Sequence, residues 1–283
     1  MRIISWNIQW GRGADGRVDL GWTIAAIGEA GGADVICLQE VAQSFPGLPG
    51  GHGEDDIAIL SEAFPDHEVV FGPALDVANG GRARARFGNL ILSSLPVEQV
   101  FRHLLPCPAD PRVPGMQRSC VEVVLSAPFG PLRVLTTHLE YYSQRQRAAQ
   151  IRALGALQDE VVGHAGAHTT GKEANPVFAP RPRPASAVVC GDFNCEPGSA
   201  EYLLMSAGAE GAEARWRDAW GVVHGAIAHA PTVGLHGAEW PDRQYCCDYV
   251  WVTEDLTPRV LDFGVATATA ASDHQPIWLE LRD

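Results

Sequence analysis

The stretch Val188-Val-Cys-Gly-Asp-Phe-Asn194 ends a run of apolar residues in a glycine, a carboxylate and an amide. Its apolar part, which is rich in β-branched side chains, predicts a buried β-strand. The polar residues then stand at the exposed end of that strand, where loops can admit water and substrate. A Gly-Asp-x-Asn sequence is also common in structural turns, so this stretch alone does not predict chemistry. It becomes informative because other strands repeat the pattern.

Five further clusters of polar residues stand next to predicted strands. Any one of them has a structural explanation, such as capping a turn or lying satisfied in the core. Polar groups beside apolar runs are costly unless they satisfy one another, so we expect the clusters to meet at one site. In chain order the key residues of these clusters are Asn7, Gln39 with Glu40, His138 with Glu140, Asp248, and Asp273 with His274.

The motifs run in the order Trp6-Asn7, Leu38-Gln39-Glu40, Thr137-His138-Leu139-Glu140, Gly191-Asp192-Phe193-Asn194, Asp248-Tyr249 and Ser272-Asp273-His274. This ordered set resembles the endonuclease/exonuclease/phosphatase superfamily, which includes DNase I, abasic-site endonucleases, neutral sphingomyelinases and tyrosyl-DNA phosphodiesterase 2. The alternation of strands and helices favours an α/β fold with two packed mixed sheets flanked by helices. The resemblance implies a four-layer α/β/β/α sandwich with its site at one end of the sheets, as a single domain over residues 1–283.

Carboxylate and amide oxygens together with two histidines suit a hard divalent cation better than zinc in a thiolate cage. The resemblance implies Mg²⁺ or Mn²⁺ as the cofactor, with one or two ions bound. It also implies that Glu40 is the principal ligand and that Asn7 and Asp273 help to complete the shell of ligands and waters.

The same resemblance implies roles in phosphoester hydrolysis. Asp192 would orient and deprotonate the attacking water, and Asn194 would bind phosphate or position that carboxylate. His274 would donate to the phosphate and be oriented by Asp248, while His138 would lie on the opposite side of the scissile group. Which of the two histidines acts as the general acid stays open at this point.

Three further residues are candidates for substrate binding. Arg118 resembles the position of a phosphate-contacting arginine in DNase I, although a strand arginine on the surface is the alternative. Asn89 is expected in the floor of the site unless it stabilises its own turn. Trp240 belongs to the segment 224–245, which we expect to form a lid or a substrate-recognition loop.

The formal net charge of −13 constrains the substrate. Proteins that follow a long polyanion present a basic stripe, and none is visible in this sequence. Gln9 stands where abasic-site endonucleases carry a carboxylate, which argues against that branch. We therefore expect a phosphodiesterase or phosphatase acting on a small molecule, a lipid headgroup or a short nucleic acid. A nuclease is the second hypothesis, and a non-catalytic binding module of the same fold is the third.

The remaining features concern the compartment and the loops. Seven cysteines without a repeating spacing predict reduced thiols, the apolar runs are too short for a bilayer, and the first residues do not indicate secretion. We expect a cytoplasmic protein without a membrane span, and nothing indicates a stable protein partner. A helix is predicted over residues 144–162 from its apolar stripe, followed by an exposed, mobile loop over 163–186.

Overall fold

Two six-stranded mixed sheets organise the chain in the part that the computed structural model describes, which is residues 1–165, 171, 175–206 and 216–283. In spatial order, the first sheet contains β11 (Val260–Val265), β12 (Ile277–Leu281), β1 (Arg2–Asn7), β2 (Val35–Gln43), β4 (Arg84–Ser93) and β3 (Glu68–Ala78). The second contains β5 (Val97–Leu104), β6 (Ser119–Ala127), β7 (Gly130–His138), β8 (Ala187–Asp192), β10 (Asp248–Val252) and β9 (Arg217–Asp218).

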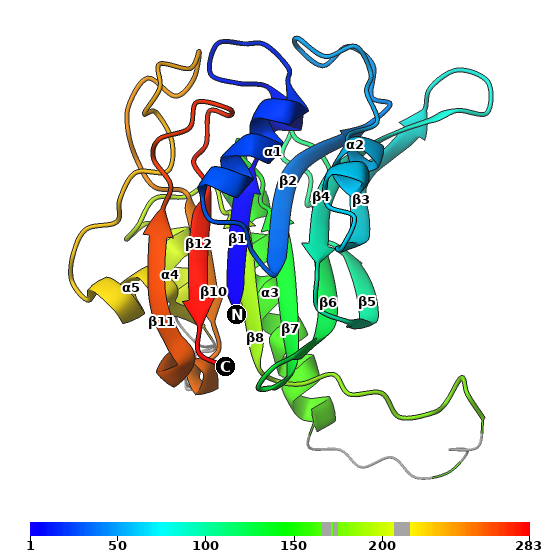
Figure 1. The fold of residues 1–283 in the computed structure, drawn as a ribbon, viewed down its shortest axis with the longest axis vertical. Helices are drawn as coiled ribbons and strands as arrows, with labels where there is room; N and C mark the ends of the chain where they lie inside the picture. Colours follow the sequence, from blue (N-terminus) through cyan, green and yellow to red (C-terminus); the bar gives the residue numbers. More distant parts are fainter. Residues whose placement is uncertain (166–170, 172–174, 207–215) are drawn as a thin grey trace.

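Each sheet has a parallel pair of strands at its centre, flanked by antiparallel strands. The parallel pair is β1–β2 in the first sheet and β7–β8 in the second. Parallel neighbours end at the same edge of a sheet, so the residues that follow them are brought together. In Figure 1, β1 and β2 both run upward, and their carboxyl ends lie at the upper edge.

Helices cover the outer faces of both sheets and complete an α/β/β/α sandwich (Figure 1). The helices α1 (Leu20–Glu29) and α2 (Asp56–Ala63) pack on the first sheet, and α3 (Gln144–Ala165) and α4 (Ala200–Ser206) pack on the second. The short α5 (Ala219–His224) contacts β10 and β11, and two 3-10 helices, η1 (Gln9–Gly11) and η2 (Glu254–Arg259), complete the described elements. The predicted four-layer architecture is confirmed.

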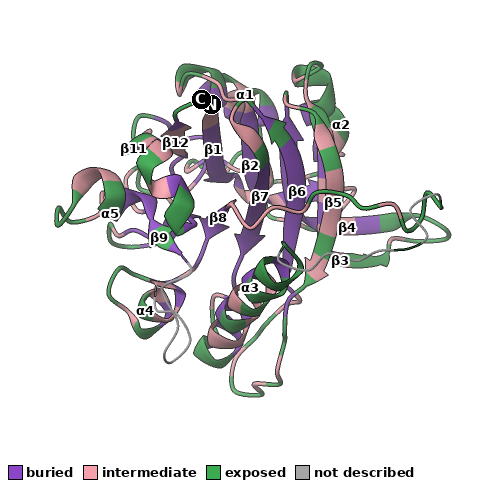
Figure 2. Cartoon of the chain, turned by 90° about the horizontal axis from the view of Figure 1, so that it is seen from below, coloured by how far each residue is buried: buried purple, intermediate pink, exposed green. Residues whose placement is uncertain are grey.

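Three apolar clusters form the core, one between the sheets and one beneath each helical layer. The period of two along each strand assigns neighbouring residues to different clusters. Ile3 faces the second sheet and Ile4 faces α1, while Val188 faces the first sheet and Val189 faces α3. Because both faces of the central strands are covered, these strands are buried along most of their length (Figure 2).

The predicted helix over 144–162 is confirmed and continues to Ala165. The predicted loop over 163–186 therefore begins three residues later, because α3 adds almost one more turn. Residues 166–170 and 172–174 of that loop lie outside the described residues, and 175–186 contain no helix or strand. In the described residues, no helix combines the length and the apolar character that crossing a bilayer requires.

A buried ion-pair network ties α3 to the second sheet. Glu122 on β6 has no exposed surface and accepts two hydrogen bonds of 2.9 Å from Arg183, and it lies 2.9 Å from the ring of His103. Its Oε1 also lies 3.3 Å from Nε of Arg133, whose guanidinium donates to Gln158 on α3 at 2.6 Å. Burial alone would raise the pKa of Glu122, but these partners outweigh it and lower the pKa to about 2.

Replacing Glu122 with glutamine should destabilise the fold, because the change leaves Arg133 buried without its counter-charge. Breaking a buried pair in this way costs about 3–5 kcal/mol. Since the native pKa is lowered, the stability that Glu122 contributes is present above the ordinary glutamate pKa and is lost as the pH falls towards 2. Urea unfolding followed by circular dichroism at several pH values measures both effects. The exposed Glu62→Gln variant is the control, and equal unfolding free energies for the two variants would contradict this role.

Candidate active site

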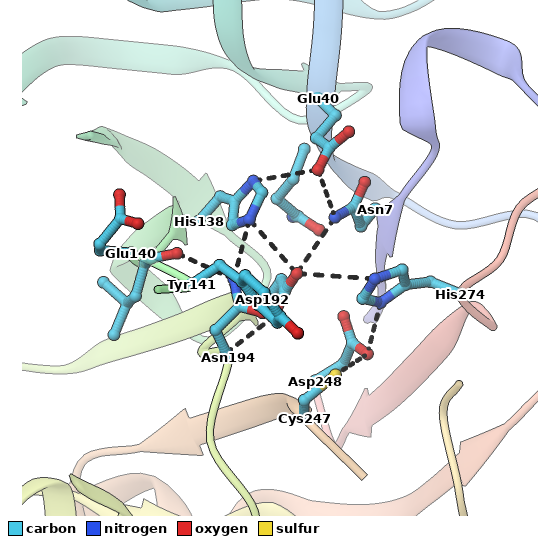
Figure 3. A network of polar contacts seen from close by, with 12 residues as sticks. Asn7, Glu40, His138, Glu140, Tyr141, Asp192, Asn194, Cys247, Asp248 and His274 are labelled. Carbon is cyan, nitrogen blue, oxygen red and sulfur yellow. Dashed lines mark hydrogen bonds and ion pairs between the residues drawn. The ribbon is translucent and has the colours of Figure 1, made fainter. Parts of the chain in front are cut away.

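The polar residues of the motifs meet at one edge of the two sheets (Figure 3). Asn7, His138 and Asp192 are the last residues of β1, β7 and β8. Asp248 is the first residue of β10, which runs antiparallel to β8, so it lies directly opposite Asp192 in the register. The ends of strands from both sheets therefore supply the cluster, as the sequence predicts.

Gly191 allows β8 to close tightly on β7 beside this cluster. Its φ of +138° lies in a region that L side chains rarely adopt, and a Cβ built on it would lie 1.9 Å from the carbonyl oxygen of Thr137. Only glycine fits this position. The close approach places Asp192 next to His138, its partner in the parallel register.

Glu40 enters the cleft from a bulge in β2. The pairing of β2 with β4 shifts register between Leu38 and Val41, and Glu40 has a φ of +58°. Bulges commonly redirect a side chain next to a functional site. The Glu40 side chain is 19% exposed and accepts a hydrogen bond of 3.2 Å from Asn7. Burial and the neighbouring carboxylate of Asp273 raise its pKa to about 7.

Glu40, Asn7 and Asp273 form a set of oxygen donors that fits a hard divalent cation. Gln9 donates to Asp273 at 2.9 Å, and Oγ of Ser272 lies 3.1 Å from the same carboxylate. Two carboxylates held near each other in a partly buried site repel, and a bound cation would relieve that repulsion. Mg²⁺ and Mn²⁺ prefer such ligands. The residues present therefore fit the predicted metal.

A second group of possible ligands lies deeper among the described residues. This group consists of Cys247, Asp248 and His274. Each offers one ligand atom, and the three atoms lie within 4.8 Å of one another. These atoms already satisfy one another, since Nδ1 of His274 lies 2.9 Å and Sγ of Cys247 lies 3.5 Å from the same oxygen of Asp248. Burial also raises the pKa of the Cys247 thiol well above its ordinary value, which disfavours the thiolate that binds metals. The oxygen donors of Glu40, Asn7 and Asp273 fit a hard divalent cation better than this group does.

Asn194 fixes the protonation of His138. The backbone N–H of Asn194 donates to Asp192 at 2.8 Å, and its side-chain amide donates to the carbonyl of Leu139 at 2.9 Å. The same amide nitrogen lies 3.0 Å from Nε2 of His138, so Nε2 accepts and the proton resides on Nδ1. Burial, followed by the charges of Arg118 and His274, holds the pKa of His138 well below its ordinary value. His138 is therefore neutral.

His274 has the opposite charge state. Its Nδ1 lies 2.9 Å from Oδ2 of Asp248, and Thr232 donates to the same oxygen at 2.6 Å. Burial alone would lower the pKa of His274, but the carboxylates of Asp248 and Asp192 raise it well above its ordinary value. The imidazolium directs Nε2 towards Asp192, at 3.7 Å. The Asp192 pKa is itself raised to about 6, mainly by burial.

A cleft of about 530 Å³ opens over these residues. Arg118 lines it, with its Nε 3.3 Å from Glu140, and Trp240 lines it with 44% of its surface exposed. Asn89 does not line this cleft. It donates to the carbonyl of Ser119 at 2.9 Å and borders a much smaller void of about 10 Å³, which Glu40, Arg118 and His138 of the cleft also line. Asn89 thus joins β4 to β6 and does not stabilise its own turn.

Several residues of the cleft were not predicted from the sequence. All of them except Gln9 are apolar or aromatic, and they have no chemical signature of their own. The only available signal was adjacency, since Tyr141 and Tyr142 follow Glu140 directly and Trp10 follows Gln9. Gln9 and Trp10 also have positive φ angles, both of +47°, and Asn194 has one of +50°. The unpredicted lining residues are Gln9, Trp10, Phe45, Leu48, Leu75, Phe87, Met116, Tyr141 and Tyr142.

The charge of His274 should depend on Asp248. Asp248→Asn removes the carboxylate that raises the His274 pKa most, so that pKa should fall towards or below its ordinary value. NMR titration of the imidazole nitrogens in the metal-free protein measures the change. The exposed Asp242→Asn is the matched control from the preceding loop. An unchanged His274 pKa in Asp248→Asn would refute the assignment.

Comparison with known proteins places the fold. The Endonuclease/Exonuclease/phosphatase family model matches residues 4–274. An endonuclease/exonuclease/phosphatase from Beutenbergia cavernae is 27% identical with a TM-score of 0.68, covering 100% of this chain and 71% of that one. A mannosyl-6-phosphatase from Bacteroides thetaiotaomicron is 15% identical with a TM-score of 0.67, covering 100% of both chains. The 3′ phosphatase NExo from Neisseria, bound to a product DNA hairpin, is 17% identical with a TM-score of 0.62, again covering 100% of both.

At such low identities the last two structures share the fold with this chain and no more. No curated protein matches the chain. The family model nevertheless covers nearly the whole sequence, and it agrees with the motif order and the four-layer sandwich. The protein therefore belongs to the endonuclease/exonuclease/phosphatase family, whose members hydrolyse phosphoesters.

Proposed function

We propose that the protein is a Mg²⁺- or Mn²⁺-dependent phosphoester hydrolase, a phosphodiesterase or phosphatase, in which water is the nucleophile. One observation carries the proposal. The carboxylate of Asp192 lies between a neutral histidine and a charged one, 3.4 Å from Nε2 of His138 and 3.7 Å from Nε2 of His274. Glu40 lines the same cleft, and its Oε1 lies 3.7 Å from Nδ1 of His138.

Glu40, Asn7 and Asp273 would hold the metal ion. A bound divalent ion polarises the phosphoryl oxygens and neutralises charge that develops on them. Asn7 also donates to Asp192 at 3.1 Å, so the same amide that contacts the metal ligand Glu40 orients the base.

Asp192 is suited to be the general base, because its pKa of about 6 lies close to neutral pH. It accepts a proton from water as the water oxygen bonds to phosphorus. The bond between phosphorus and the ester oxygen then breaks, and the leaving oxygen takes a proton from water. The leaving oxygen departs opposite the attacking water, whereas Nε2 of His274 lies 3.7 Å from Asp192, so we assign His274 to donate to a phosphoryl oxygen on the side of the base. Asp248 holds the His274 ring in place through Nδ1.

The substrate class is constrained by charge. Among the described residues, Arg118 is the only lysine or arginine that lines the cleft, and its Nε already contacts Glu140. With a net charge of −13, this weighs against a long nucleic acid. A nuclease remains the second candidate, because a similar structure is a 3′ phosphatase bound to a DNA hairpin. A non-catalytic binding module is the least supported, since every predicted catalytic side chain is present.

The cysteines support a reducing compartment. All seven are free, and six of them are buried. Structural disulfides persist mainly in oxidising compartments, so we propose that the protein works in the cytoplasm.

Hydrolysis should depend on metal, Asp192 and His274. We expect turnover of bis(p-nitrophenyl) phosphate, p-nitrophenyl phosphate or a short single-stranded DNA with Mg²⁺ or Mn²⁺ and none with EDTA. Asp192→Asn and His274→Ala should each lower kcat by about 100- to 10,000-fold. The exposed Asp66→Asn is the control. Full activity in EDTA would contradict the metal dependence, and unchanged kcat in Asp192→Asn would contradict the choice of base.

Glu40 should control metal affinity. We expect Glu40→Gln to weaken Mn²⁺ binding by roughly 10- to 100-fold or more, because it removes a charged ligand. Isothermal titration calorimetry without substrate measures this, with the exposed Glu68→Gln as the control. If Cys247→Ala abolishes binding while Glu40→Gln does not, the deeper group of ligands is the metal site instead.

A further inference from the structure

The cleft has two separate apolar walls. We define the first wall as Trp10, Phe45, Leu48, Leu75 and Phe87, and the second wall as Tyr141, Tyr142 and Trp240. The proposed hydrolytic chemistry uses none of these side chains. Their arrangement therefore bears on what the substrate carries besides its phosphate.

The first wall is built on the sheet that supplies Glu40. Phe87 lies on β4 and packs against Trp10, with ring centroids 6.2 Å apart, and against Phe45, at 6.0 Å. Phe45 lies two residues after the end of β2 and five residues after Glu40. The rings thus form one continuous apolar surface next to the proposed metal ligand.

Two members of the second wall, Tyr141 and Tyr142, follow β7 of the sheet that supplies His138 and Asp192, and the third, Trp240, lies on the loop between α5 and β10. Tyr141 follows β7 and packs edge-on against Tyr142 and Trp240, with centroids 4.7 Å and 5.1 Å apart. Among the described residues, ring contacts join members within each wall but none joins one wall to the other. Both walls line the same cleft as Glu40, His138 and Asp192.

The exposure of the second wall indicates that it binds something. Tyr142 is 57% exposed and Trp240 is 44% exposed, although both are large rings that folding favours burying. Exposed apolar surface beside a catalytic cleft commonly contacts a ligand. Aromatic rings favour flat partners, which they contact by offset stacking or edge to face.

We infer that the substrate is a phosphodiester of low charge that carries a flat aromatic group on each side of phosphorus. This inference rests on the proposed hydrolase function of the same site. Each wall would hold one group, and a cleft of about 530 Å³ is in the range that accommodates a ligand of this size. In the reaction, a water oxygen bonds to phosphorus and one phosphorus–oxygen ester bond breaks. The aromatic alcohol leaves with a proton, and a phosphomonoester that carries the other group remains.

Kinetics with matched esters test the inference. Bis(p-nitrophenyl) phosphate and methyl p-nitrophenyl phosphate share a leaving group and differ in the group that is retained. Relative to the uncatalysed rates, we expect kcat/KM to be roughly tenfold higher for the diaryl ester, since one aromatic contact is at stake. p-Nitrophenyl phosphate, which lacks a second group, should be the poorer substrate.

Two variants assign the walls. Trp240→Ala opens the second wall and Phe45→Ala opens the first, and one of them should abolish the preference for the diaryl ester. The wall whose variant abolishes the preference holds the group that is retained after hydrolysis. The variant of the other wall, which holds the leaving group, should lower kcat/KM for both diesters. Trp240→Phe keeps an aromatic ring, so it should retain most of the kcat/KM that Trp240→Ala loses. Leu104→Ala, which changes a side chain that is 69% exposed on β5, is the control.

Calorimetry gives a readout that needs no turnover. With metal-loaded Asp192→Asn, diphenyl phosphate should bind about 100-fold more tightly than dibutyl phosphate, because two aromatic contacts are at stake, and adding Trp240→Ala should reduce that difference to about tenfold. A dinucleoside monophosphate tests whether the flat groups are nucleobases or simple aryl rings. Tighter binding than diphenyl phosphate would identify nucleobases, and weaker binding would identify aryl groups.

The outcomes separate the two proposals. Metal-dependent turnover without any preference for the diaryl ester, together with equal binding of diphenyl and dibutyl phosphate, would overturn this inference and leave the hydrolase function in place. If no ester is hydrolysed but diphenyl phosphate still binds preferentially through Trp240, the aromatic cleft stands and the hydrolase function is wrong. Tighter binding of dibutyl phosphate would overturn the aromatic assignment in favour of an alkyl substituent.

Discussion

The side-chain amide of Asn7 donates to carboxylates from both sheets, to Glu40 at 3.2 Å and to Asp192 at 3.1 Å. Asn7 is itself fixed on two sides, because its Oδ1 accepts from the backbone N–H of Gln9 and its carbonyl accepts from Ser272. It is 1% exposed, so water does not compete for these bonds. The position of the proposed base relative to the proposed metal ligand is therefore set by one buried amide.

The charge states of the two histidines follow from their partners. An amide donor meets His138 at 3.0 Å, whereas a carboxylate meets His274 at 2.9 Å. Both rings are almost fully buried, so burial disfavours the charged form of each. Only His274 has a carboxylate that outweighs this cost. The two histidines next to Asp192 therefore differ in charge. His138 offers a hydrogen-bond acceptor at Nε2, and His274 offers a hydrogen-bond donor at the same atom.

Much of the fold and the site was predictable, because both depend on local patterns. Apolar runs that end in Asp192 or His138 mark strand ends, and parallel pairing brings such ends to one edge. The protonation of His138 was not predictable, because it depends on where the amide of Asn194 points. The two walls were not predictable either. Phe87 reads as an ordinary strand residue, and only the three-dimensional structure shows that its ring faces the cleft.

The backbone around the cleft has an unusual conformation. Gln9, Trp10, Glu40 and Asn194 have positive φ angles, which cost free energy for any residue except glycine. The bulge in β2 and the ends of β1 and β8 hold these angles in place. At these four positions glycine would adopt the backbone angle with less strain, but the side chain that glycine lacks is the one that lines the cleft. The strained backbone is thus a cost in folding free energy that is tied to the shape of the cleft.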